Sequence, residues 1–206
     1  MEFDIVTLIY GWKMDEAKKH MKEKLELDEI YVTDLVHCPL KYQFQKKYPD
    51  LALAGSFNPS ALQGEFIHIG VEEVLKMLLG NENVKTEVEY ERRIEVDGKA
   101  YIVKGRVDAI VGDYIIEIKS ARSDVGIPHE HHVEQLRIYM WLTGLRKGIL
   151  LYVTPARIVQ FLYTDPASEG EVTDHIRSII NGSPAPRYTW ECNYCPFASI
   201  CPKKRT

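Results

Sequence analysis

The sequence predicts an α/β fold, in which helices flank a mixed central sheet between a helical N-terminal part and an irregular C-terminal segment. Strand patterns occupy the middle of the chain, from about residue 88 to 119 and again from 148 to 164. Helical patterns precede these strands, separate the two groups and follow the second group. The 206 residues, of which 45% are hydrophobic and 27% charged, suffice for one large core of an ordinary globular protein.

The N-terminal part is predicted to be helical. Residues 12–29 are rich in Lys, Glu, Met and Leu, which favour a helix. Thr33 or Asp34 can cap a second helix, because short polar side chains accept hydrogen bonds from a helix's first free N–H groups. We expect this second helix to contain Cys38 and to be interrupted near Pro39.

A flexible connection and a long helix are predicted next. Residues 49–60 (PDLALAGSFNPS) carry turn-forming residues. The helix is expected from about Ser60 to Leu79 and ends at Gly80-Asn81. Apolar residues recur along it at helical spacing, at Leu62, Phe66, Ile69 and Val74.

The first group of strands is predicted to form a meander. Val88–Val96 and Tyr101–Val111 both alternate between apolar and polar residues, as half-buried strands do. Asp97-Gly98 between them is a strong hairpin signal, since both residues tolerate positive φ angles. Gly112-Asp113 is a second turn, and Tyr114–Lys119 is the third strand.

The second half of the chain is predicted to add a helix, two strands and a final helix. These are residues 130–143, 148–154, 157–164 and, starting at Asp165-Pro166, about 165–180. A polar loop with Gly126 and Pro128 precedes the first of them. The stretch NGSPAPRY (181–188) is a linker into the C-terminal segment.

Composition bounds the location and the partners. The start of the chain lacks a basic region followed by a cleavage site, and no apolar run approaches the roughly 20 residues that span a bilayer. We therefore expect a cytoplasmic protein with no membrane partner. The net charge of −4 does not by itself indicate nucleic-acid binding. Two basic runs offset it locally, Lys41, Lys46 and Lys47 after Cys38, and Lys203, Lys204 and Arg205 after Cys201.

Four cysteines indicate a metal or cluster site. Cys192, Cys195 and Cys201 lie together in CNYCPFASIC, whereas Cys38 is separated from them by about 150 residues. Four thiolates complete either a structural zinc site or an iron–sulfur cluster, and a reducing cytosol disfavours disulfides. Buried free thiols are the simpler alternative. If all four cysteines share one site, the metal joins the N-terminal segment to the C-terminal segment.

A catalytic constellation is predicted on two neighbouring strands. Glu117 and Lys119 in YIIEIKS are two residues apart and therefore point to one face of a strand. The turn at Gly112-Asp113 folds the strand with Asp108 beside them. Two carboxylates suit Mg²⁺ or Mn²⁺, and a lysine there can orient water or stabilise charge on a phosphate. The alternative is an exposed strand edge with an ordinary Glu–Lys pair.

Three further residues belong to this hypothesis. His68, on the preceding helix, can supply a nitrogen ligand to the metal. Gln135 and Tyr139 are four residues apart and share a helix face, from which they can orient the lysine or a nucleic-acid strand. Each of the three is also consistent with an ordinary partly buried side chain.

A second histidine-rich stretch, HEHH at residues 129–132, is not the metalloprotease motif, because that motif requires a histidine where Val133 stands. We expect a polar loop near the rim of the site, with accessory metal binding as a lesser alternative. The chain also lacks a Walker-type glycine loop, which argues against an ATP-driven motor.

The order of His68, Asp108, Glu117-x-Lys119 and Gln135-x3-Tyr139, with C-x2-C-x5-C at the end and a distant cysteine at the start, resembles a known family. It is similar to the RecB-type nucleases of the PD-(D/E)xK superfamily. Within them it resembles the small CRISPR-associated exonucleases of the adaptation machinery, which carry an iron–sulfur cluster. The resemblance covers nearly the whole chain. Val107 stands before Asp108 where the motif has proline, a departure that the superfamily tolerates.

The resemblance implies roles for these residues. His68, Asp108, Glu117 and the backbone carbonyl of Ile118 are expected to bind Mn²⁺ or Mg²⁺, and Lys119 is expected to be the catalytic lysine. Gln135 and Tyr139 match the motif that follows the catalytic strand. The expected ligands of the iron–sulfur cluster, for which 4Fe–4S is favoured over 2Fe–2S, are Cys38, Cys192, Cys195 and Cys201.

The resemblance also implies a restriction-endonuclease-like fold and a domain division. Residues 1–60 form an N-terminal helical segment that supplies one cluster cysteine. Residues 61–180 form the RecB-like nuclease core, and residues 181–206 form a linker and cysteine segment that packs with the N-terminal segment.

The implied function is a metal-dependent deoxyribonuclease that acts 5′ to 3′ on single-stranded DNA, with endonuclease activity as a further option. It would process DNA fragments for CRISPR spacer acquisition together with the integrase complex. Two alternatives are a RecB-like DNA-repair nuclease outside CRISPR and a non-catalytic DNA-binding cluster protein. Stacking of bases on exposed rings would help to hold the strand, and the candidate rings are Tyr31, Tyr42, Phe44, Tyr139 and Trp190.

Overall fold

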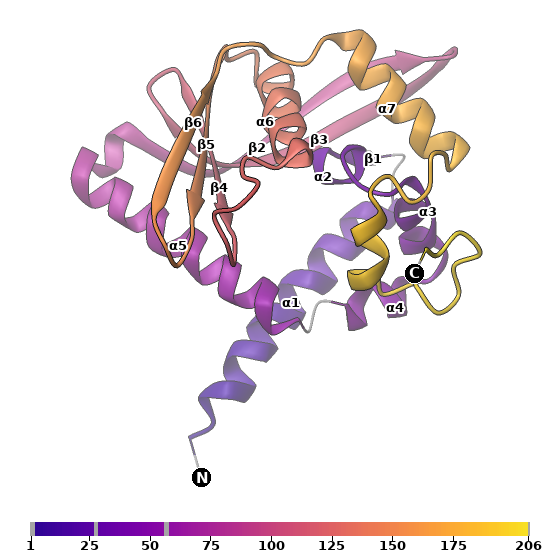
Figure 1. Ribbon diagram of the computed structural model, residues 1–206, viewed down its shortest axis with the longest axis horizontal. Coiled ribbons are helices and arrows are strands. Elements are labelled where there is room, and N and C mark those ends of the chain that lie inside the picture. Colours follow the sequence, from indigo (N-terminus) through magenta and orange to yellow (C-terminus); the bar gives the residue numbers. More distant parts are fainter. Residues whose placement is uncertain (1–2, 27–28, 56–57, 206) are drawn as a thin grey trace.

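The computed structural model describes residues 3–26, 29–55 and 58–205, and it confirms the α/β fold with a mixed sheet flanked by helices (Figure 1). Six strands of the described chain form one sheet, in the order β1-β3-β4-β5-β6, with β2 paired to β3 off this path. They are β1 (Glu29–Tyr31), β2 (Val84–Val96), β3 (Lys99–Val111), β4 (Tyr114–Ser120), β5 (Lys147–Val153) and β6 (Ile158–Tyr163).

The predicted turns set the register of the first three strands. Asp97 and Gly98 have φ angles of 52° and 77°, and this left-handed pair is the geometry that closes a two-residue hairpin between β2 and β3. Gly112, with φ of 58°, turns the chain from β3 into β4. Ala109 of β3 pairs with Ile116 of β4, so the next pair of positions places Asp108 opposite Glu117.

Helices cover both faces of the sheet. They are α1 (Ile5–Glu26), α2 (Val32–Leu35), α3 (Pro39–Lys47), α4 (Pro49–Ala54), α5 (Pro59–Leu79), α6 (Glu130–Thr143) and α7 (Glu169–Asn181), with short 3₁₀ turns η1 (Asn81–Asn83) and η2 (Thr189–Tyr194). The helix α6 connects the parallel strands β4 and β5 and packs on one face with α2 and α7, and α5 packs on the other (Figure 1).

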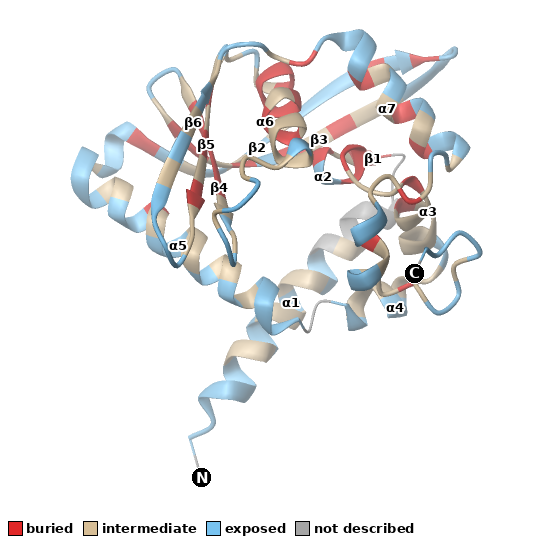
Figure 2. Ribbon diagram, in the orientation of Figure 1, coloured by how far each residue is buried: buried red, intermediate tan, exposed pale blue. Residues whose placement is uncertain are grey.

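The hydrophobic core is divided by the sheet into a large and a small part. The large part lies between the sheet and α6, where Leu136, Ile138 and Met140 are fully buried (Figure 2). The small part, under α5, is built from Ala109, Ile116 and Ile118. Polar residues on β3 and β4 therefore emerge between two packed layers, which hold these strands in place.

The predicted N-terminal elements are partly wrong. The first helix starts at Ile5 instead of residue 12, and residue 29, its predicted end, belongs to β1. Residues 27–28 of the prediction lie outside the described residues. Cys38 is not inside a helix but is the N-cap of α3, because Pro39 takes the first helical position, where its missing N–H costs nothing. The connection predicted for 49–60 instead contains α4, which begins at Pro49 for the same reason. Residues 56–57 of that connection lie outside the described residues.

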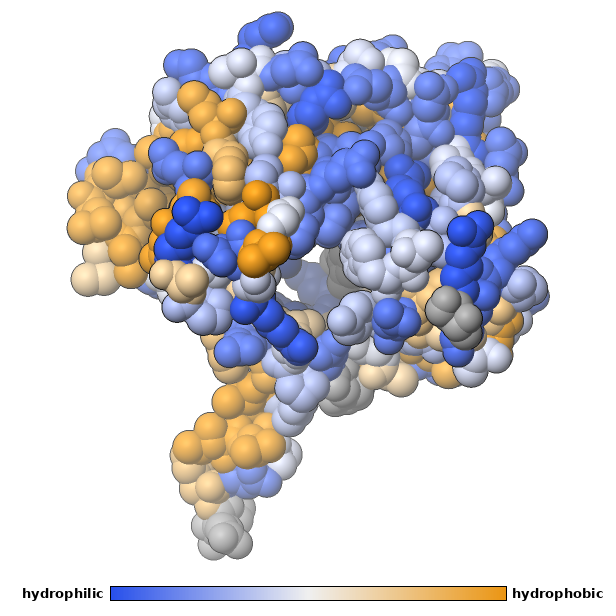
Figure 3. Space-filling view, in the orientation of Figure 1, coloured by the Kyte–Doolittle hydropathy of each residue, from blue (hydrophilic) through white to orange (hydrophobic). Residues whose placement is uncertain are grey.

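The long helix α5 is confirmed, but its predicted apolar positions do not mark the packed face. Phe66, Ile69 and Val74 are about half exposed, and the helix packs on the sheet through Val71 and Leu75. Because this helix carries apolar residues nearly all round, periodicity alone does not identify the buried side. Its uncovered residues contribute to the apolar area at the left of Figure 3.

Other predicted elements differ in detail. The strand β2 begins at Val84, earlier than predicted, and the short strand β1 was not predicted. The final helix α7 begins at Glu169 instead of Asp165-Pro166, because Ser168 and Glu171 form a reciprocal capping box.

The helices α3 and α4 of the N-terminal part meet the C-terminal part of the chain on one side of the sheet. The helix α3 packs against α7, and the C-terminal segment lies beside α3 and α4 (Figure 1). The first half of α1 projects away from the rest of the molecule (Figure 1). None of the helices in the described residues has the length and apolar character needed to cross a membrane.

Candidate active site and cysteine pocket

Two carboxylates face each other at the centre of the candidate site. Asp108 of β3 accepts a hydrogen bond at Oδ2 from the backbone N–H of Ile118, over 2.7 Å. Glu117, on the adjacent strand, is 2% exposed. Burial raises the pKa of Glu117, and the charge of Asp108 raises it further, whereas Lys119 opposes the shift.

A chain of hydrogen bonds fixes Lys119 beside these carboxylates. The Lys119 ammonium donates to Glu117 Oε1 over 2.7 Å and to Gln135 Oε1 over 2.9 Å. Gln135 Nε2 in turn donates to the Tyr139 hydroxyl over 3.4 Å. Both Gln135 and Tyr139 are buried. In the structure they therefore contact the lysine network, and Tyr139 presents no exposed ring for a DNA base.

The residue opposite Tyr139 explains its position. A Cβ atom added at Gly105 of β3 would lie 2.5 Å from a ring carbon of Tyr139, so only glycine leaves room for the phenol. Together, β3, β4 and α6 position the network from Asp108 to Tyr139 without relying on a loop.

One oxygen of Glu117 has no partner. Its Oε2 is fully buried and makes no hydrogen bond, although an unsatisfied buried carboxylate oxygen costs free energy. A buried polar atom without a partner in a native site suggests that a bound group is missing. Glu117 lies beside Asp108, where a divalent cation that prefers oxygen ligands would supply that partner.

His68 of α5 completes the predicted set. Its Nδ1 lies 3.5 Å from Asp108 Oδ2. Burial disfavours the charged imidazolium, but the hydrogen bond and charge of Asp108 outweigh burial and raise the pKa of His68 overall. The structure therefore brings His68, Asp108, Glu117 and Lys119 together. No three His, Cys, Asp or Glu side chains anywhere in the described ranges converge closely enough to be recognised as a site for a single ion.

Sequence reasoning missed two further acids, Glu72 and Glu87. Glu72 is 6% exposed and hydrogen-bonds Glu87, which lies opposite Asp108 in the register of β2 and β3. Burial, followed by the charges of Glu87 and Asp108, raises the pKa of Glu72 to about 7. The available signal was the four-residue spacing from His68, which places Glu72 on the same face of α5.

The raised pKa of Glu72 predicts a pH-dependent cost to stability. An acid with a pKa of about 7 when folded and 4.5 when unfolded binds more protons in the folded state between these values. The folded state therefore loses stability from this group as pH rises from 4.5 to 7. Glu72→Gln keeps a hydrogen-bond donor toward Glu87 and removes this loss, so it should stabilise the protein above pH 7 by on the order of 1 kcal/mol.

The measurement is the melting temperature of wild type and Glu72→Gln in EDTA, from pH 4.5 to pH 8. The difference between the two should grow in favour of the variant across this window. Glu73→Gln, at an exposed position one residue along α5, is the matched control and should change little. A constant difference between wild type and Glu72→Gln at all pH values would contradict the assignment.

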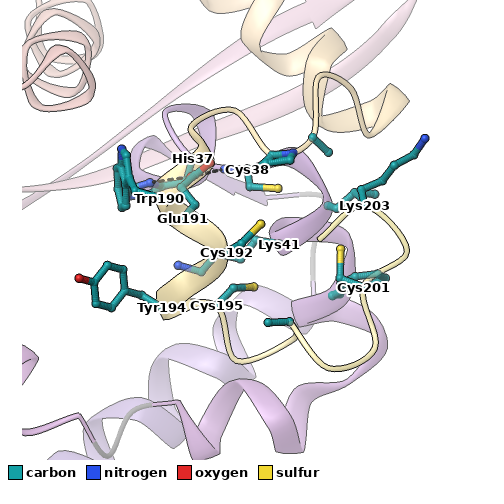
Figure 4. A pocket seen from close by; sticks show the side chains of 15 residues that line it. His37, Cys38, Lys41, Trp190, Glu191, Cys192, Tyr194, Cys195, Cys201 and Lys203 are labelled. Carbon is teal, nitrogen blue, oxygen red and sulfur yellow. Dashed lines mark hydrogen bonds and ion pairs between the residues drawn. The ribbon is translucent and has the colours of Figure 1, made fainter. Parts of the chain in front are cut away.

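All four cysteines line one cavity of about 70 Å³. Their sulfur atoms surround this cavity from the start of α3 and from the C-terminal segment (Figure 4). Burial raises the pKa of the Cys38 and Cys195 thiols, and Cys38 also feels the charge of Cys195. The cysteines that are distant in sequence therefore converge, and Lys41 and Lys203 from the two basic runs line the same cavity.

A buried carboxylate fastens the two halves of this pocket. Glu191 Oε1 accepts from the backbone N–H of Cys38 over 2.8 Å and lies 3.3 Å from Nδ1 of His37. Glu191 Oε2 accepts from the backbone N–H of Tyr188 over 2.9 Å. These hydrogen bonds therefore join the segment around Cys38 to the C-terminal segment without the help of a metal.

The remaining candidate residues have different environments. Tyr42 is buried and donates to the carbonyl of Glu29, and Phe44 packs on Phe197. Among the five candidate rings for base stacking, Trp190 stands out as 40% exposed. The HEHH stretch is not a polar loop, because residues 130–132 form the first turn of α6 and His131 and His132 are partly buried.

The chain is similar to known nucleases. The sequence profile of the PD-(D/E)XK nuclease superfamily matches residues 72–202. The chain is 44% identical to the CRISPR-associated exonuclease Cas4 of Saccharolobus solfataricus, over 98% of this chain and 100% of that protein.

Solved structures share the fold of this chain. The crystal structure of SSO0001 is similar over 100% of both chains, with a TM-score of 0.93 and 43% identity. An alkaline exonuclease from Laribacter hongkongensis matches over 80% of this chain and 93% of its own, with a TM-score of 0.52 and 14% identity. The latter likeness concerns the fold alone.

Proposed function

Because this chain belongs to the PD-(D/E)XK nuclease superfamily, and within it to the family of the CRISPR-associated exonuclease Cas4, we propose that it hydrolyses DNA with the help of Mg²⁺ or Mn²⁺. The observation that carries the proposal is Lys119, held by Glu117 and Gln135 beside a buried carboxylate oxygen that lacks a partner.

The residues present fit a divalent cation. Asp108 and Glu117 would provide hard oxygen donors, His68 would provide a nitrogen, and the backbone carbonyl of Ile118, next to Glu117 on β4, would add a further oxygen. The partnerless Oε2 of Glu117 supports this assignment. When bound, such a cation acts as a Lewis acid that withdraws electron density from the phosphodiester and makes a water molecule more acidic.

Lys119 is a positive charge that the protein itself places in the site. Its ammonium is oriented by two acceptors and is 16% exposed, so its direction is fixed before substrate binds. A fixed charge of this kind stabilises negative charge that develops on the attacked phosphate, and it can orient the attacking water. Gln135 and Tyr139 act through the lysine as positioning residues. Hydrolysis then leaves a 5′-phosphate and a 3′-hydroxyl.

We assign the four cysteines to an iron–sulfur cluster, preferably 4Fe–4S, with 2Fe–2S as the alternative. All four line one cavity, and the resemblance to the cluster-carrying nucleases favours a cluster over a zinc ion there. The cluster would reinforce the junction that Glu191 already makes between the chain ends.

The substrate and context are proposed from the family. The substrate is single-stranded DNA, degraded from 5′ to 3′ with some endonuclease action, during processing of fragments for CRISPR spacer acquisition with the integrase complex. The domain division at residues 60 and 180 is part of the same proposal. A face of the molecule is hollowed at its centre, with a largely hydrophilic surface around the hollow, as a site for an unpaired strand requires (Figure 3).

The proposal is tested with anaerobically purified protein and single-stranded oligonucleotides that carry a label at the 5′ or the 3′ end. Cleavage should require Mn²⁺ or Mg²⁺ and stop in EDTA. Release of the 5′ label as small products, while 3′-labelled strands shorten gradually, is expected for 5′-to-3′ digestion. A protein that binds these strands but leaves them intact in both metals would favour the non-catalytic alternative.

A further inference from the structure

Six planar side chains gather between the candidate active site and the cysteine pocket. We call them the ring cluster, and they come from the turn between α2 and α3, the start of α6 and the segment around η2. Its members are His37, His129, His131, His132, Tyr188 and Trp190. The ring centroids of His131 and Trp190 are 5.0 Å apart, and those of Tyr188 and Trp190 are 5.9 Å apart with nearly parallel planes.

The ring cluster lies next to both sites. His37 directly precedes Cys38, and Trp190 lies two residues before Cys192. On its other side the cluster lies close enough to Lys119 for the lysine charge to act on His131. Burial, followed by the charges of His37, His129 and Lys119, lowers the pKa of His131 to about 4. His131 is therefore a neutral ring at neutral pH.

Trp190 presents the open face of the cluster. Its side chain is 40% exposed, and that of Tyr194 is 71% exposed. Both project from η2 on the side away from the cysteine sulfurs (Figure 4). The Trp190 indole packs against other rings on one side and is exposed to solvent on the other. Exposure of so large an apolar surface is unfavourable, which suggests that a ligand covers it.

The charges beside the cluster are largely paired with one another. Burial raises the pKa of the Tyr188 phenol, the charges of Glu134 and Glu130 raise it further, and the charge of Arg187 opposes them. Glu134 lies within ion-pair distance of both His175 and Arg187. The carboxylate of Glu191 is turned inward, to His37 and the backbone of Cys38. The neutral His131 ring, the Tyr188 phenol and the Trp190 indole suit the flat face of a base, since every base offers a π-face to stack.

We propose that Trp190, supported by His131 and His37, is a stacking platform for unpaired bases of the DNA strand whose backbone occupies the site around Lys119. This inference rests on the proposed function, because it takes single-stranded DNA as the substrate. It assigns a base-binding role to the side of the molecule that also carries the cysteines.

The experiment compares a labelled oligothymidylate with an abasic strand of the same length, by fluorescence anisotropy in EDTA, so that no cleavage occurs. Wild type should bind the oligothymidylate more tightly than the abasic strand. Trp190→Ala should weaken binding of the oligothymidylate about tenfold and leave binding of the abasic strand unchanged. Trp190→Phe should retain most of the affinity.

Trp12→Ala is the matched control, because Trp12 of α1 is 38% exposed and lies outside the ring cluster. If Trp190→Ala does not fold, Trp190→Leu keeps apolar volume without a stacking face and should give the same selective loss. Equal affinity of wild type for the two strands, no binding of either, or an equal loss on both strands in the variant would overturn the platform.

Cleavage of the same oligothymidylate in Mn²⁺ is measured separately. Wild-type cleavage without base-dependent binding would leave the nuclease proposal standing and remove the platform. Base-dependent binding that needs Trp190, without cleavage in Mn²⁺ or Mg²⁺, would leave the platform standing and contradict the nuclease proposal.

Discussion

Lys119→Ala should reduce the rate of DNA cleavage by about 10²- to 10³-fold or more, which is the usual cost of removing one fixed donor that stabilises transition-state charge. The loss should appear in the rate of the chemical step, because Lys119 is held in a fixed direction by Glu117 and Gln135. DNA binding in EDTA should change little. The measurement is single-turnover cleavage of an end-labelled single strand in Mn²⁺.

The substitution also removes the cation that partners Glu117. A buried carboxylate that loses its partner is destabilising, unless it takes up a proton. Lys119→Gln, which restores a hydrogen-bond donor without the charge, therefore accompanies Lys119→Ala, together with melting curves and Mn²⁺ titration of both variants. Lys85→Ala, at an exposed position of β2, is the control. Wild-type rates in Lys119→Ala would remove this residue from the mechanism.

Cys192→Ala should yield a colourless protein with little iron or sulfide and a free energy of unfolding lowered by several kcal/mol, on the order of what structural metal sites contribute. Cys192 lines the cavity that it shares with the three other cysteines, and its Sγ accepts a hydrogen bond from the backbone of Arg205. The measurements are visible absorption, iron, sulfide and zinc content, and thermal melting after anaerobic purification.

Ser199→Ala is the control for this variant, because Ser199 is exposed in the same loop, between Cys195 and Cys201. It should keep the colour and the stability of wild type. A wild type that is colourless yet folded and active would contradict the cluster assignment. Zinc in equal amount to protein, without sulfide, would replace the cluster by a zinc site and leave the nuclease site unaffected.

The parts of the fold that were predicted correctly are governed by neighbours in sequence. Alternation in β3 and the Asp97-Gly98 turn fixed the hairpin, and the two-residue spacing of Glu117 and Lys119 placed them on one face. The strand β1 was missed because three residues carry no period, and its existence depends on parallel pairing with β3. The buried face of α5 was also not predictable, because it depends on which side chains meet the sheet.

The candidate site shows the same limit. The contacts of Lys119 with Glu117 and Gln135 follow from spacing within a strand and a helix. The burial of Glu72 against Glu87, by contrast, depends on how α5 lies across the hairpin of β2 and β3, which no local pattern reveals. The ring cluster required three distant segments to meet, so sequence alone identified Trp190 without its neighbours.

The hydrogen bond from Cys38 to Glu191 has a consequence for biosynthesis. A ribosome makes Cys38 early and Glu191 near the end, at a sequence separation of 153, so the N-terminal helices make their last native contacts only when nearly the whole chain has been synthesised. Until then they expose surface that the finished protein covers, which is when growing chains are vulnerable to aggregation and proteolysis. A product truncated after Pro186 would lack Glu191 and three of the four thiols. Its N-terminal helices would stay exposed and would be accessible to proteases.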